Sequence, residues 1–246
     1  MRHQMESKKK KVQVVGPGKA GCSLGTALER KGWIVQEYLG KTDDLQDAAQ
    51  SVDLLVIATP DEVISTVSRK IQPNPSTVIA HLSGVLGLDV LAPHNLRMGL
   101  HPLASLPNPE RGADLLESGI WFGITGDPLG KEIVDELGGK YFHVADEDRS
   151  LYHAVAVTAS NHLTSLLGQV ERIAKELDIP FEAFLNLALE TMKNIETLGP
   201  SEALTGPASR GDSQTIALHL QALPEDERSL YKLLSDNAKR LSERKE

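Results

Sequence analysis

The spacing of apolar residues changes character once along the chain. In the first part, short apolar runs alternate with segments in which apolar positions recur every three or four residues. Such runs indicate strands, and the wider spacing indicates amphipathic helices. Runs that are almost continuously apolar are typical of parallel strands covered on both faces. The alternation predicts an α/β domain built on a doubly wound sheet of seven or eight strands.

The individual elements of this domain follow from the same pattern. Strands are expected where short runs rich in Val, Ile and Leu are bounded by polar or glycine residues, at 12–15, 33–39, 53–60, 77–82, 97–103, 119–126 and 140–144. Helices are expected between some of these runs, at 19–30, 61–71 and 128–137.

The pattern beyond residue 147 is helical throughout. A long and mostly apolar helix is predicted at 148–177, and further helices at 181–198, at 213–223 and from Pro224 onward. A helix as apolar as the first of these must pack against other helices, from its own chain or from a partner. We therefore predict three parts: a solvated basic tail at 1–11, the α/β domain at 12–147, and an all-helical domain at 148–246 that binds substrate and forms a homodimer.

Composition narrows the function classes. The net charge of −8 argues against a general nucleic-acid binder and against binding to anionic membranes. No apolar run approaches the roughly 20 residues that a membrane-spanning helix needs. The single cysteine, Cys22, offers neither an internal disulfide nor a metal cluster, which favours a reducing, cytoplasmic setting and no metal site. Cys22 is interpreted as a small core residue rather than a reactive thiol.

A glycine motif lies between the first predicted strand and the first predicted helix. Its glycines stand as Gly16-x-Gly18-x-x-Gly21, the spacing of a dinucleotide-binding turn. Gly16 permits the tight turn, Gly18 leaves room for a pyrophosphate, and Gly21 lets the helix pack close to the strand. The helix N-terminus then faces the phosphates. The residues expected to hold the pyrophosphate are Gly16, Pro17, Gly18, Lys19, Ala20 and Gly21.

The loop after the second predicted strand bears on the choice of nucleotide. Lys41 and Thr42 supply a cation and a hydroxyl there, which suits the 2′-phosphate of NADP. Glu37 lies at about the distance expected of an acid that accepts from the 2′-hydroxyl of NAD. NADP is therefore favoured, and NAD stays open as the less favoured cofactor.

Polar residues follow several predicted strands, at the edge where α/β sheets bind ligands. One group follows the third strand, and Pro60 there either flanks a cofactor ring or simply ends the strand. His81 and Ser83 follow the next strand. His101 precedes Pro102 and is therefore held extended, which favours a defined position for its side chain. The candidates for the nicotinamide environment are Ala58, Thr59, Pro60, Ser83, Gly84 and His101.

Three polar residues of the helical half are candidates for substrate contact. On a regular helix His153, Asn161 and Thr164 lie within about 80° of one another, so that they line one wall of a cleft or bond to neighbouring helices. Arg210 lies in an irregular loop at 205–212, where its guanidinium could clamp a carboxylate or phosphate of an anionic substrate. The alternative is a structural pair with Asp212 that caps the next helix.

These residues carry a resemblance to a known family. The chain resembles bacterial Rossmann-like oxidoreductases whose C-terminal domain is of unknown function, and is more distantly similar to pyrroline-5-carboxylate reductase, ketopantoate reductase, and the 6-phosphogluconate and 3-hydroxyisobutyrate dehydrogenases. The resemblance implies an N-terminal NADP domain, an all-helical C-terminal domain and a dimer. It is carried by the blocks Val15–Gly21, Ile57–Asp61, His81–Gly84, His101–Leu103, Tyr152–Ala154 with Ala159–Asn161, and Leu204–Pro207 with Arg210–Asp212.

One departure affects the expected chemistry. The hydroxyacid dehydrogenases and ketopantoate reductase place a catalytic Lys one helical turn before an Asn; if Asn161 matches that Asn, the Lys position is Val157. Valine cannot transfer a proton, so His153, one turn earlier, becomes the candidate proton donor. With His153, Asn161 and Arg210 as catalytic candidates, we predict an NADP-dependent oxidoreductase acting on a small carbonyl, imine or alcohol at the domain interface. A non-catalytic NADP-binding sensor is the alternative, and a deazaflavin coenzyme a weaker one.

Overall fold

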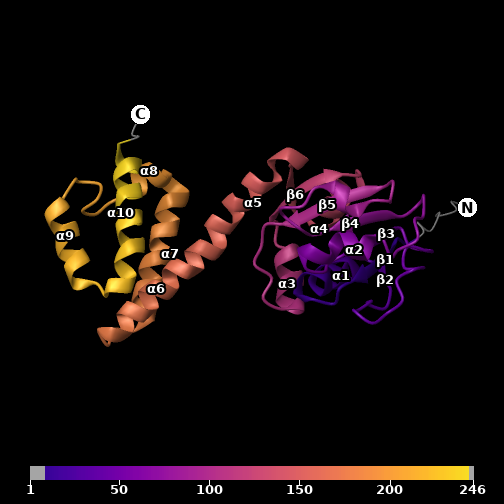
Figure 1. Cartoon of the computed structure of the whole chain (residues 1–246), viewed down its shortest axis with the longest axis horizontal. Coiled ribbons are helices and arrows are strands. Elements are labelled where there is room, and N and C mark those ends of the chain that lie inside the picture. The colour runs from indigo at the N-terminus through magenta and orange to yellow at the C-terminus, as the bar shows by residue number, and fades with distance from the viewer. Residues whose placement is uncertain (1–8, 244–246) are drawn as a thin grey trace, which may run out of the picture. The chain divides into compact units, whose positions relative to one another are not determined.

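The computed structural model describes residues 9–243, so most of the predicted tail at 1–11 lies outside the described residues. The chain divides into two compact units, one ending at Ser160 and one beginning at Asn161 (Figure 1). The first unit includes α5 (Arg149–Val157), which the predicted boundary at 147/148 assigns to the helical domain. The chain is thus an α/β unit followed by a helical one, as the sequence predicts.

The first unit contains a seven-stranded sheet in the order β2-β1-β3-β4-β5-β6-β7. All neighbouring strands run parallel except β5 and β6, which are antiparallel. The carboxyl ends of β1, β3, β4 and β5 therefore lie next to one another at one edge of the sheet. The strands are β1 (Lys11–Val15), β2 (Ile34–Val35), β3 (Leu54–Ile57), β4 (Val78–His81), β5 (Arg97–Pro102), β6 (Trp121–Gly126) and β7 (Lys140–His143).

The second strand is shorter than the predicted 33–39. β2 covers two residues, although Leu39 pairs with Val15 again as an isolated bridge. Between these points the buried Gln13 donates its side-chain amide to the Glu37 carbonyl at 2.6 Å, in place of a backbone donor. The prediction of a continuous strand is wrong because a side chain of β1 substitutes for part of the ladder.

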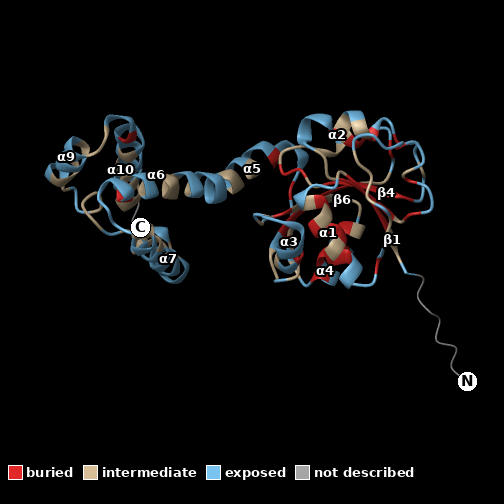
Figure 2. Ribbon diagram, turned by 90° about the horizontal axis from the view of Figure 1, so that it is seen from below, coloured by how far each residue is buried: buried red, intermediate tan, exposed pale blue. Residues whose placement is uncertain are grey.

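Two apolar layers cover the sheet. One face packs against α1 (Lys19–Arg30), α3 (Pro109–Leu116) and α4 (Leu129–Leu137) through strand residues that include Val14, Val56 and Leu100. The other face packs, over β1, β3 and β4, against α2 (Asp61–Ser68) and the 3₁₀ turn η1 (Leu88–Leu91). In Figure 2 the buried residues are concentrated in this sheet and in the helix faces that contact it.

Helix α3 was not predicted from the sequence. Its N-cap is Asn108, whose side chain accepts from the Arg111 N–H at 2.9 Å, and Pro109 occupies the first turn. Gly112 weakens the helical pattern but is required by packing, because a Cβ there would lie 2.8 Å from the Ser23 Cβ of α1. The apolar spacing alone could not reveal a helix whose contact residue is a glycine.

The predicted helix at 148–177 is present but not uniform. A 3₁₀ turn, η2 (Asp146–Asp148), leads into α5, which is followed by a π-helical segment, η3 (Thr158–His162), and then by α6 (Leu163–Glu176). The expectation that His153, Asn161 and Thr164 share a face assumed 100° per residue throughout. That angle does not hold across a π-helical turn, so the helical-wheel argument fails between His153 and Asn161.

The second unit is helical. The helices predicted at 181–198 and 213–223 are confirmed, and the last begins with a 3₁₀ turn at Glu225. Among residues 9–243, no helix is long and apolar enough to cross a lipid bilayer. Beyond α6, the elements are α7 (Phe181–Leu198), α8 (Pro200–Ala203), α9 (Ser213–Ala222), η4 (Glu225–Glu227) and α10 (Arg228–Ser242).

Candidate functional site

The glycine turn has the geometry that the motif predicts. Gly16 has a φ of +98°, and a Cβ on it would lie 2.8 Å from the Ala58 carbonyl carbon. A Cβ on Gly21 would lie 2.5 Å from the Gly16 carbonyl oxygen and 2.9 Å from the Ala58 Cβ. At Gly18, by contrast, a Cβ would meet no atom within 4 Å. Two glycines are therefore required by packing, and the third leaves open space in front of the turn.

That open space adjoins the N-terminus of α1. The first turn of α1 contains no acidic residue, and its first residue is the exposed Lys19. Cys22 is the first residue whose N–H is satisfied within the helix, by the Gly18 carbonyl at 3.0 Å. The N–H groups before it point outward with the positive end of the helix dipole, which suits an anion such as a pyrophosphate. Cys22 is half-buried, and burial raises the pKa of its thiol, which agrees with a packing role.

The loop with Lys41 and Thr42 begins beside this turn. The Gly16 N–H donates to the Leu39 carbonyl at 2.8 Å, so the loop that follows Leu39 starts next to the glycine turn. Asp43 closes the following turn by accepting from the Gly40 N–H at 2.6 Å. Lys41 and Thr42 are exposed at its tip. A cation and a hydroxyl are thus available next to the candidate nucleotide cradle.

The ends of β3 and β4 hold the next predicted residues. Ala58 packs against the glycine turn, Pro60 is the exposed N-cap of α2, and the Thr59 hydroxyl is buried without a hydrogen-bond partner among the described residues. The Ser83 hydroxyl is fully used: it donates to Asp61 Oδ2 at 2.7 Å and accepts from two backbone N–H groups. Ser83 therefore holds the loop after β4 in shape, whatever ligand binds beside it.

Part of one sheet face is polar rather than apolar. On the face that α2 covers elsewhere, β4, β5 and β6 present His81, Gly99, His101, Gly123 and Thr125, which we call the polar face. Strand pairing arranges them in two rows: His81 opposite Gly99 and then Thr125, and His101 opposite Gly123 and then Phe142 of β7. In each row a glycine separates two side chains, and each gap is filled by a residue of α5.

Tyr152 fills the gap over Gly123. A Cβ on that glycine would lie 2.7 Å from the Tyr152 hydroxyl. The hydroxyl lies 2.6 Å from Nδ1 of His101, and the two rings meet edge to face with centroids 5.5 Å apart. On its other side the Tyr152 ring contacts Phe142, at 5.6 Å between centroids. The phenol is therefore held between an imidazole and an apolar ring.

Arg149 fills the gap over Gly99. Its side chain is 1% exposed, and its guanidinium lies where a Cβ on Gly99 would be. It donates to Asp146 Oδ1 at 3.2 Å and to the Ser83 carbonyl at 3.3 Å, while Nη2 has no partner among the described residues. A buried cation with one carboxylate and one carbonyl is only partly compensated, and it acts on every titratable neighbour.

The two histidines of the polar face are held neutral. Burial, and then the positive charge of Arg149, lowers the pKa of His81 to about 4. Burial, followed by the neighbouring His153 and Arg149, lowers the pKa of His101 to about 4 as well. Burial raises the pKa of Tyr152 to about 12. At neutral pH the cluster therefore consists of neutral imidazoles and a protonated phenol beside one guanidinium.

His153 lies on the other side of His101. The two ring centroids are 5.9 Å apart. Gly84 makes this approach possible, because a Cβ there would lie 2.6 Å from His153 Cδ2 and 3.0 Å from His101 Nε2. The structure therefore brings His153, Gly84 and His101 together at the carboxyl ends of β4 and β5, on the same side of the sheet as the glycine turn after β1.

The remaining predicted residues belong to the second unit. Asn161 lies in η3, and Arg210 is exposed in the loop before α9. The structural role considered for Asp212 is confirmed, because its carboxylate accepts from the Thr215 N–H at 3.0 Å and caps α9. No ion pair between Arg210 and Asp212 is formed among residues 9–243.

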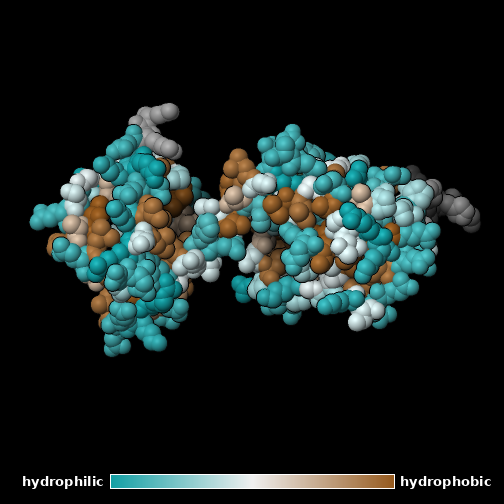
Figure 3. All heavy atoms as spheres, viewed as in Figure 1, coloured by the Kyte–Doolittle hydropathy of each residue, from teal (hydrophilic) through white to brown (hydrophobic). Residues whose placement is uncertain are grey.

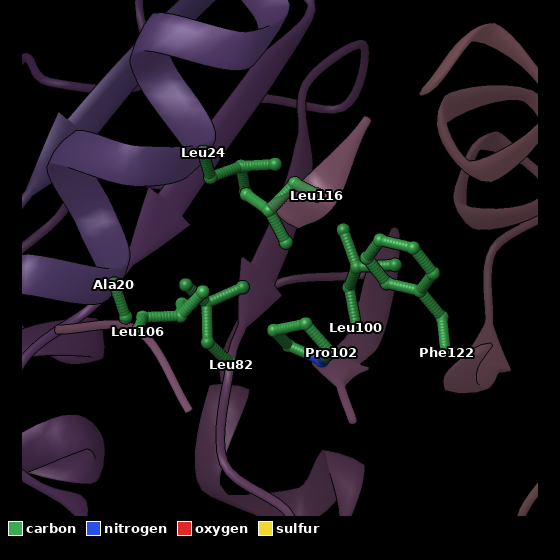
Figure 4. A pocket seen from close by; sticks show the side chains of 8 residues that line it. All are labelled: Ala20, Leu24, Leu82, Leu100, Pro102, Leu106, Leu116 and Phe122. Carbon is green, nitrogen blue, oxygen red and sulfur yellow. The ribbon is translucent and has the colours of Figure 1, made fainter. Parts of the chain in front are cut away.

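An apolar pocket lies close to the cradle but is not part of it. It runs beneath the first turn of α1 and the ends of β4 and β5, and it is too narrow to hold a water molecule (Figure 4). Its lining is apolar throughout: Ala20, Leu24, Leu82, Leu100, Pro102, Leu106, Leu116 and Phe122. We assign it to the core under the site, since it offers a ligand no polar group.

Sequence reasoning missed Arg149 and the role of Tyr152. The apolar pattern predicts a helix through Arg149 without a role for that residue, and Tyr152 enters only through the block Tyr152–Ala154 that carries the family resemblance. A signal was present in the strands, where Gly99 and Gly123 occupy positions that alternate with buried apolar residues. A glycine at an inward strand position indicates that another group approaches the backbone closely.

Comparison with protein families accounts for both parts of the chain. Residues 38–107 match a Rossmann-like domain, and residues 120–238 match a domain of unknown function, DUF2520. None of the curated proteins compared with the chain matches it. The two matches agree with the family expected from the sequence motifs.

Solved structures share the fold over most of the chain. Protein TM1727 of Thermotoga maritima is 26% identical, with a TM-score of 0.73, covering 94% of this chain and 98% of its own. Protein BF3122 of Bacteroides fragilis, described as a "putative NADP oxidoreductase", is 22% identical, with a TM-score of 0.77 and the same coverage. Pyrroline carboxylate reductase of Plasmodium falciparum, solved with NADP bound, is 13% identical, with a TM-score of 0.60, covering 95% and 98%.

Proposed function

We propose that this chain, which joins a Rossmann-like domain to a DUF2520 domain, is an NADP-dependent oxidoreductase acting on small carbonyl, imine or alcohol substrates. The observation that carries the proposal is the turn at Gly16–Gly21, with open space at Gly18 in front of unpaired helix N–H groups. Structures with this fold include an NADP-bound reductase, which supports the same cofactor class.

In this proposal, residues of the first unit would hold the dinucleotide along its whole length. The Gly16–Gly21 turn would hold the pyrophosphate, and Lys41 with Thr42 the 2′-phosphate. Thr59, Pro60, Gly84 and His101 would flank the nicotinamide, which when bound exchanges a hydride with substrate. The buried Thr59 hydroxyl without a partner is consistent with a ligand at this edge, because such a group is costly to leave unsatisfied.

The polar cluster favours an enzyme over a sensor. The sensor alternative rested on Val157 standing where related dehydrogenases have a lysine. A protein that only bound the nucleotide would not need two neutral histidines and a phenol at the carboxyl ends of its strands. His101, Tyr152 and His153 provide groups that can hold or transfer a proton without that lysine.

We also propose that the chain works as a cytoplasmic homodimer through its helical unit. Within residues 161–243, Ala174 is the only apolar side chain that is fully buried. Large apolar side chains are exposed instead, among them Leu187, Leu198 and Leu233, and Figure 3 shows apolar atoms gathered on this unit. Exposed apolar surface of this kind marks an interface. Asn161 and Arg210 remain our candidates for contacts to an anionic substrate.

The cofactor is tested by titrating the purified protein with NADPH and with NADH. We expect tighter binding of NADPH, and Lys41→Ala should weaken it about tenfold while changing NADH binding little, because only NADPH carries the 2′-phosphate. Lys70→Ala, which removes an exposed lysine after α2, serves as the matched control. Binding of neither nucleotide would exclude this function.

The reaction is tested by following the absorbance of NADPH over a panel of small ketones, aldehydes and cyclic imines. We expect oxidation of NADPH with at least one class. Tight binding of NADPH without oxidation across the whole panel would favour the sensor instead.

A further inference from the structure

The hydrogen bond between Tyr152 and His101 occupies a defined place on the polar face. It lies in the row formed by His101, Gly123 and Phe142, where the glycine leaves room for the phenol. We propose that His101 is the proton donor of the reaction, giving its Nε2 proton to the substrate, and that Tyr152 is the positioning residue that keeps that proton on Nε2. This inference rests on the proposed function, and it gives His101 a role beyond flanking the cofactor.

The surroundings of the pair decide which atom donates. The Tyr152 hydroxyl has one hydrogen-bond partner among the described residues, Nδ1 of His101, and its other neighbours are Phe142 and the backbone at Gly123. If Nδ1 carried a proton, the phenolic hydrogen would point into apolar surroundings without an acceptor. With the phenol donating, Nδ1 accepts and the ring proton resides on Nε2. The high pKa of Tyr152 and the low pKa of His101 favour the same arrangement.

The Nε2 side of the ring is left free for a ligand. It faces the backbone of Gly84, where an added Cβ would lie 3.0 Å from Nε2. The hydrogen bonds recorded for His101 in the described chain use Nδ1 only. A side chain at position 84 would fill this space, so the glycine keeps the donor accessible at the edge of the sheet where ligands bind.

The proton transfer balances without a further reagent. The Nε2–H bond breaks as an O–H or N–H bond forms on the reduced substrate, and the phenolic O–H bond breaks as an N–H bond forms on Nδ1. The imidazole remains neutral with its proton now on Nδ1, and Tyr152 is left as phenolate. Before the next turnover a proton from water adds to the bare Nε2 and the Nδ1 proton returns to the phenolate, which restores the starting tautomer. The hydride of the proposed function accounts for the two electrons. An alkoxide is a stronger base than a phenolate, so the transfer runs downhill.

The charged and titratable groups around His101 come from three elements. Tyr152, His153 and Arg149 face it from α5, and His81 from β4. Asp61 acts on it from α2 and is the one group that favours the charged ring. Desolvation and the two neighbours from α5 outweigh this carboxylate. His101 should therefore stay neutral at pH values well above its lowered pKa of about 4.

The arrangement is tested first without cofactor or substrate. The His101 signals in nitrogen-15 NMR spectra of the full chain are assigned by their loss in His101→Asn. Between about pH 5.5 and about pH 8 they should show an unprotonated Nδ1 and a protonated Nε2. In Tyr152→Phe the ring should populate both tautomers. A protonated Nδ1, or a charged ring at neutral pH, would overturn the inference. Tyr231→Phe is the matched control, since it removes a similar Tyr–His pair with His219 in the other unit.

Kinetics with a substrate found in the panel give the second test. Tyr152→Phe should lower kcat about 10–100-fold with little change in KM, and His101→Asn about 100–10,000-fold, because a general acid contributes on this scale. Gly123→Ala, which displaces the hydroxyl but keeps the tyrosine, should resemble Tyr152→Phe. NADPH binding should survive in Tyr152→Phe and Gly123→Ala, which leave the proposed cofactor contacts unchanged. Full activity of Tyr152→Phe would refute the role of Tyr152 in positioning the His101 proton. Failure of the unaltered chain to bind NADPH would refute the proposed function instead.

Discussion

His81 is fully buried, and neither of its ring nitrogens has a hydrogen-bond partner among the described residues. It lies in the same row as Gly99, over which the Arg149 guanidinium is packed. A charged imidazole beside a buried cation is strongly disfavoured, so His81 acts as an apolar ring at neutral pH. Folding therefore depends on keeping this ring uncharged.

This dependence predicts how stability changes with pH. The unfolded chain protonates His81 near its ordinary pKa of 6.5, but the folded chain does so only near 4. Between these values the unfolded state binds more protons, so the free energy of unfolding falls as the pH is lowered from 6.5 to 4, by up to about 3 kcal/mol for this residue. Urea titrations at about pH 4.5, 5.5 and 7 measure how the free energy of unfolding changes with pH.

The share of His81 is isolated by substitution. His81→Asn should reduce the slope in this window, although it destabilises the protein at every pH. His143→Asn, which changes an exposed histidine of β7, should leave the slope unchanged. An equal slope in the protein and in His81→Asn would show that His81 titrates normally in the folded state.

At the scale of the strand–turn–helix element, we expect substitutions of Gly18 and Gly21 to affect nucleotide binding and stability differently. Gly18→Ala should leave stability within about 0.5 kcal/mol, because its φ of −80° suits alanine and the space is open, but it should weaken NADPH binding. Gly21→Ala should cost about 1–3 kcal/mol, because its Cβ would strike the Gly16 carbonyl. Thermal melts and nucleotide titrations of both variants test this; equal losses of stability would contradict it.

Most elements could be predicted because the apolar and polar pattern of a segment reflects which of its residues are buried. β3 is a continuous apolar run, β4 is apolar up to His81, and α1 begins and ends at the predicted residues 19 and 30. The errors arose where a neighbour decides the structure. A Gln13 side chain shortens β2, Ser23 of α1 requires the glycine within α3, and η3 interrupts a pattern that looks uniformly helical.

The candidate site divides in the same way. The glycine turn could be identified because its spacing reflects contacts within one strand–turn–helix unit. The Tyr152–His101 pair joins β5 to α5 across 51 positions, and Arg149 reaches the Ser83 carbonyl across 66. Such contacts depend on strand order and on the antiparallel placement of β6, neither of which is written in any local pattern.

At the scale of the whole molecule, the helical unit buries few apolar side chains for its length. The exposed fractions of Leu187, Leu198 and Leu233 are 64%, 56% and 60%, and the buried residues Gln169 and Glu227 are polar. Little apolar surface is therefore buried within this unit, and covering its exposed leucines would stabilise it. A second copy of the chain would cover it.

The dimer is tested by sedimentation at micromolar concentration. We expect the mass of two chains, and Leu187→Lys should shift the equilibrium toward single chains by about tenfold or more, because a charge would be buried at the interface. Lys193→Leu, on the same helix, alters another exposed residue and serves as the control. A single-chain mass for the unaltered protein would contradict the proposed dimer.

The glycines of the polar face also constrain how this chain can diverge. A Cβ added at Gly99 or Gly123 of the polar face, or at Gly84 beside it, would collide with a side chain of α5, so the residue size allowed at each position depends on that side chain. A lineage that replaced Tyr152 by a small residue would leave a void that a larger residue at position 123 could fill, and the reverse order would be blocked by collision. Positions 123 and 152 should therefore covary in size among relatives, with loss of the phenol preceding gain of the side chain.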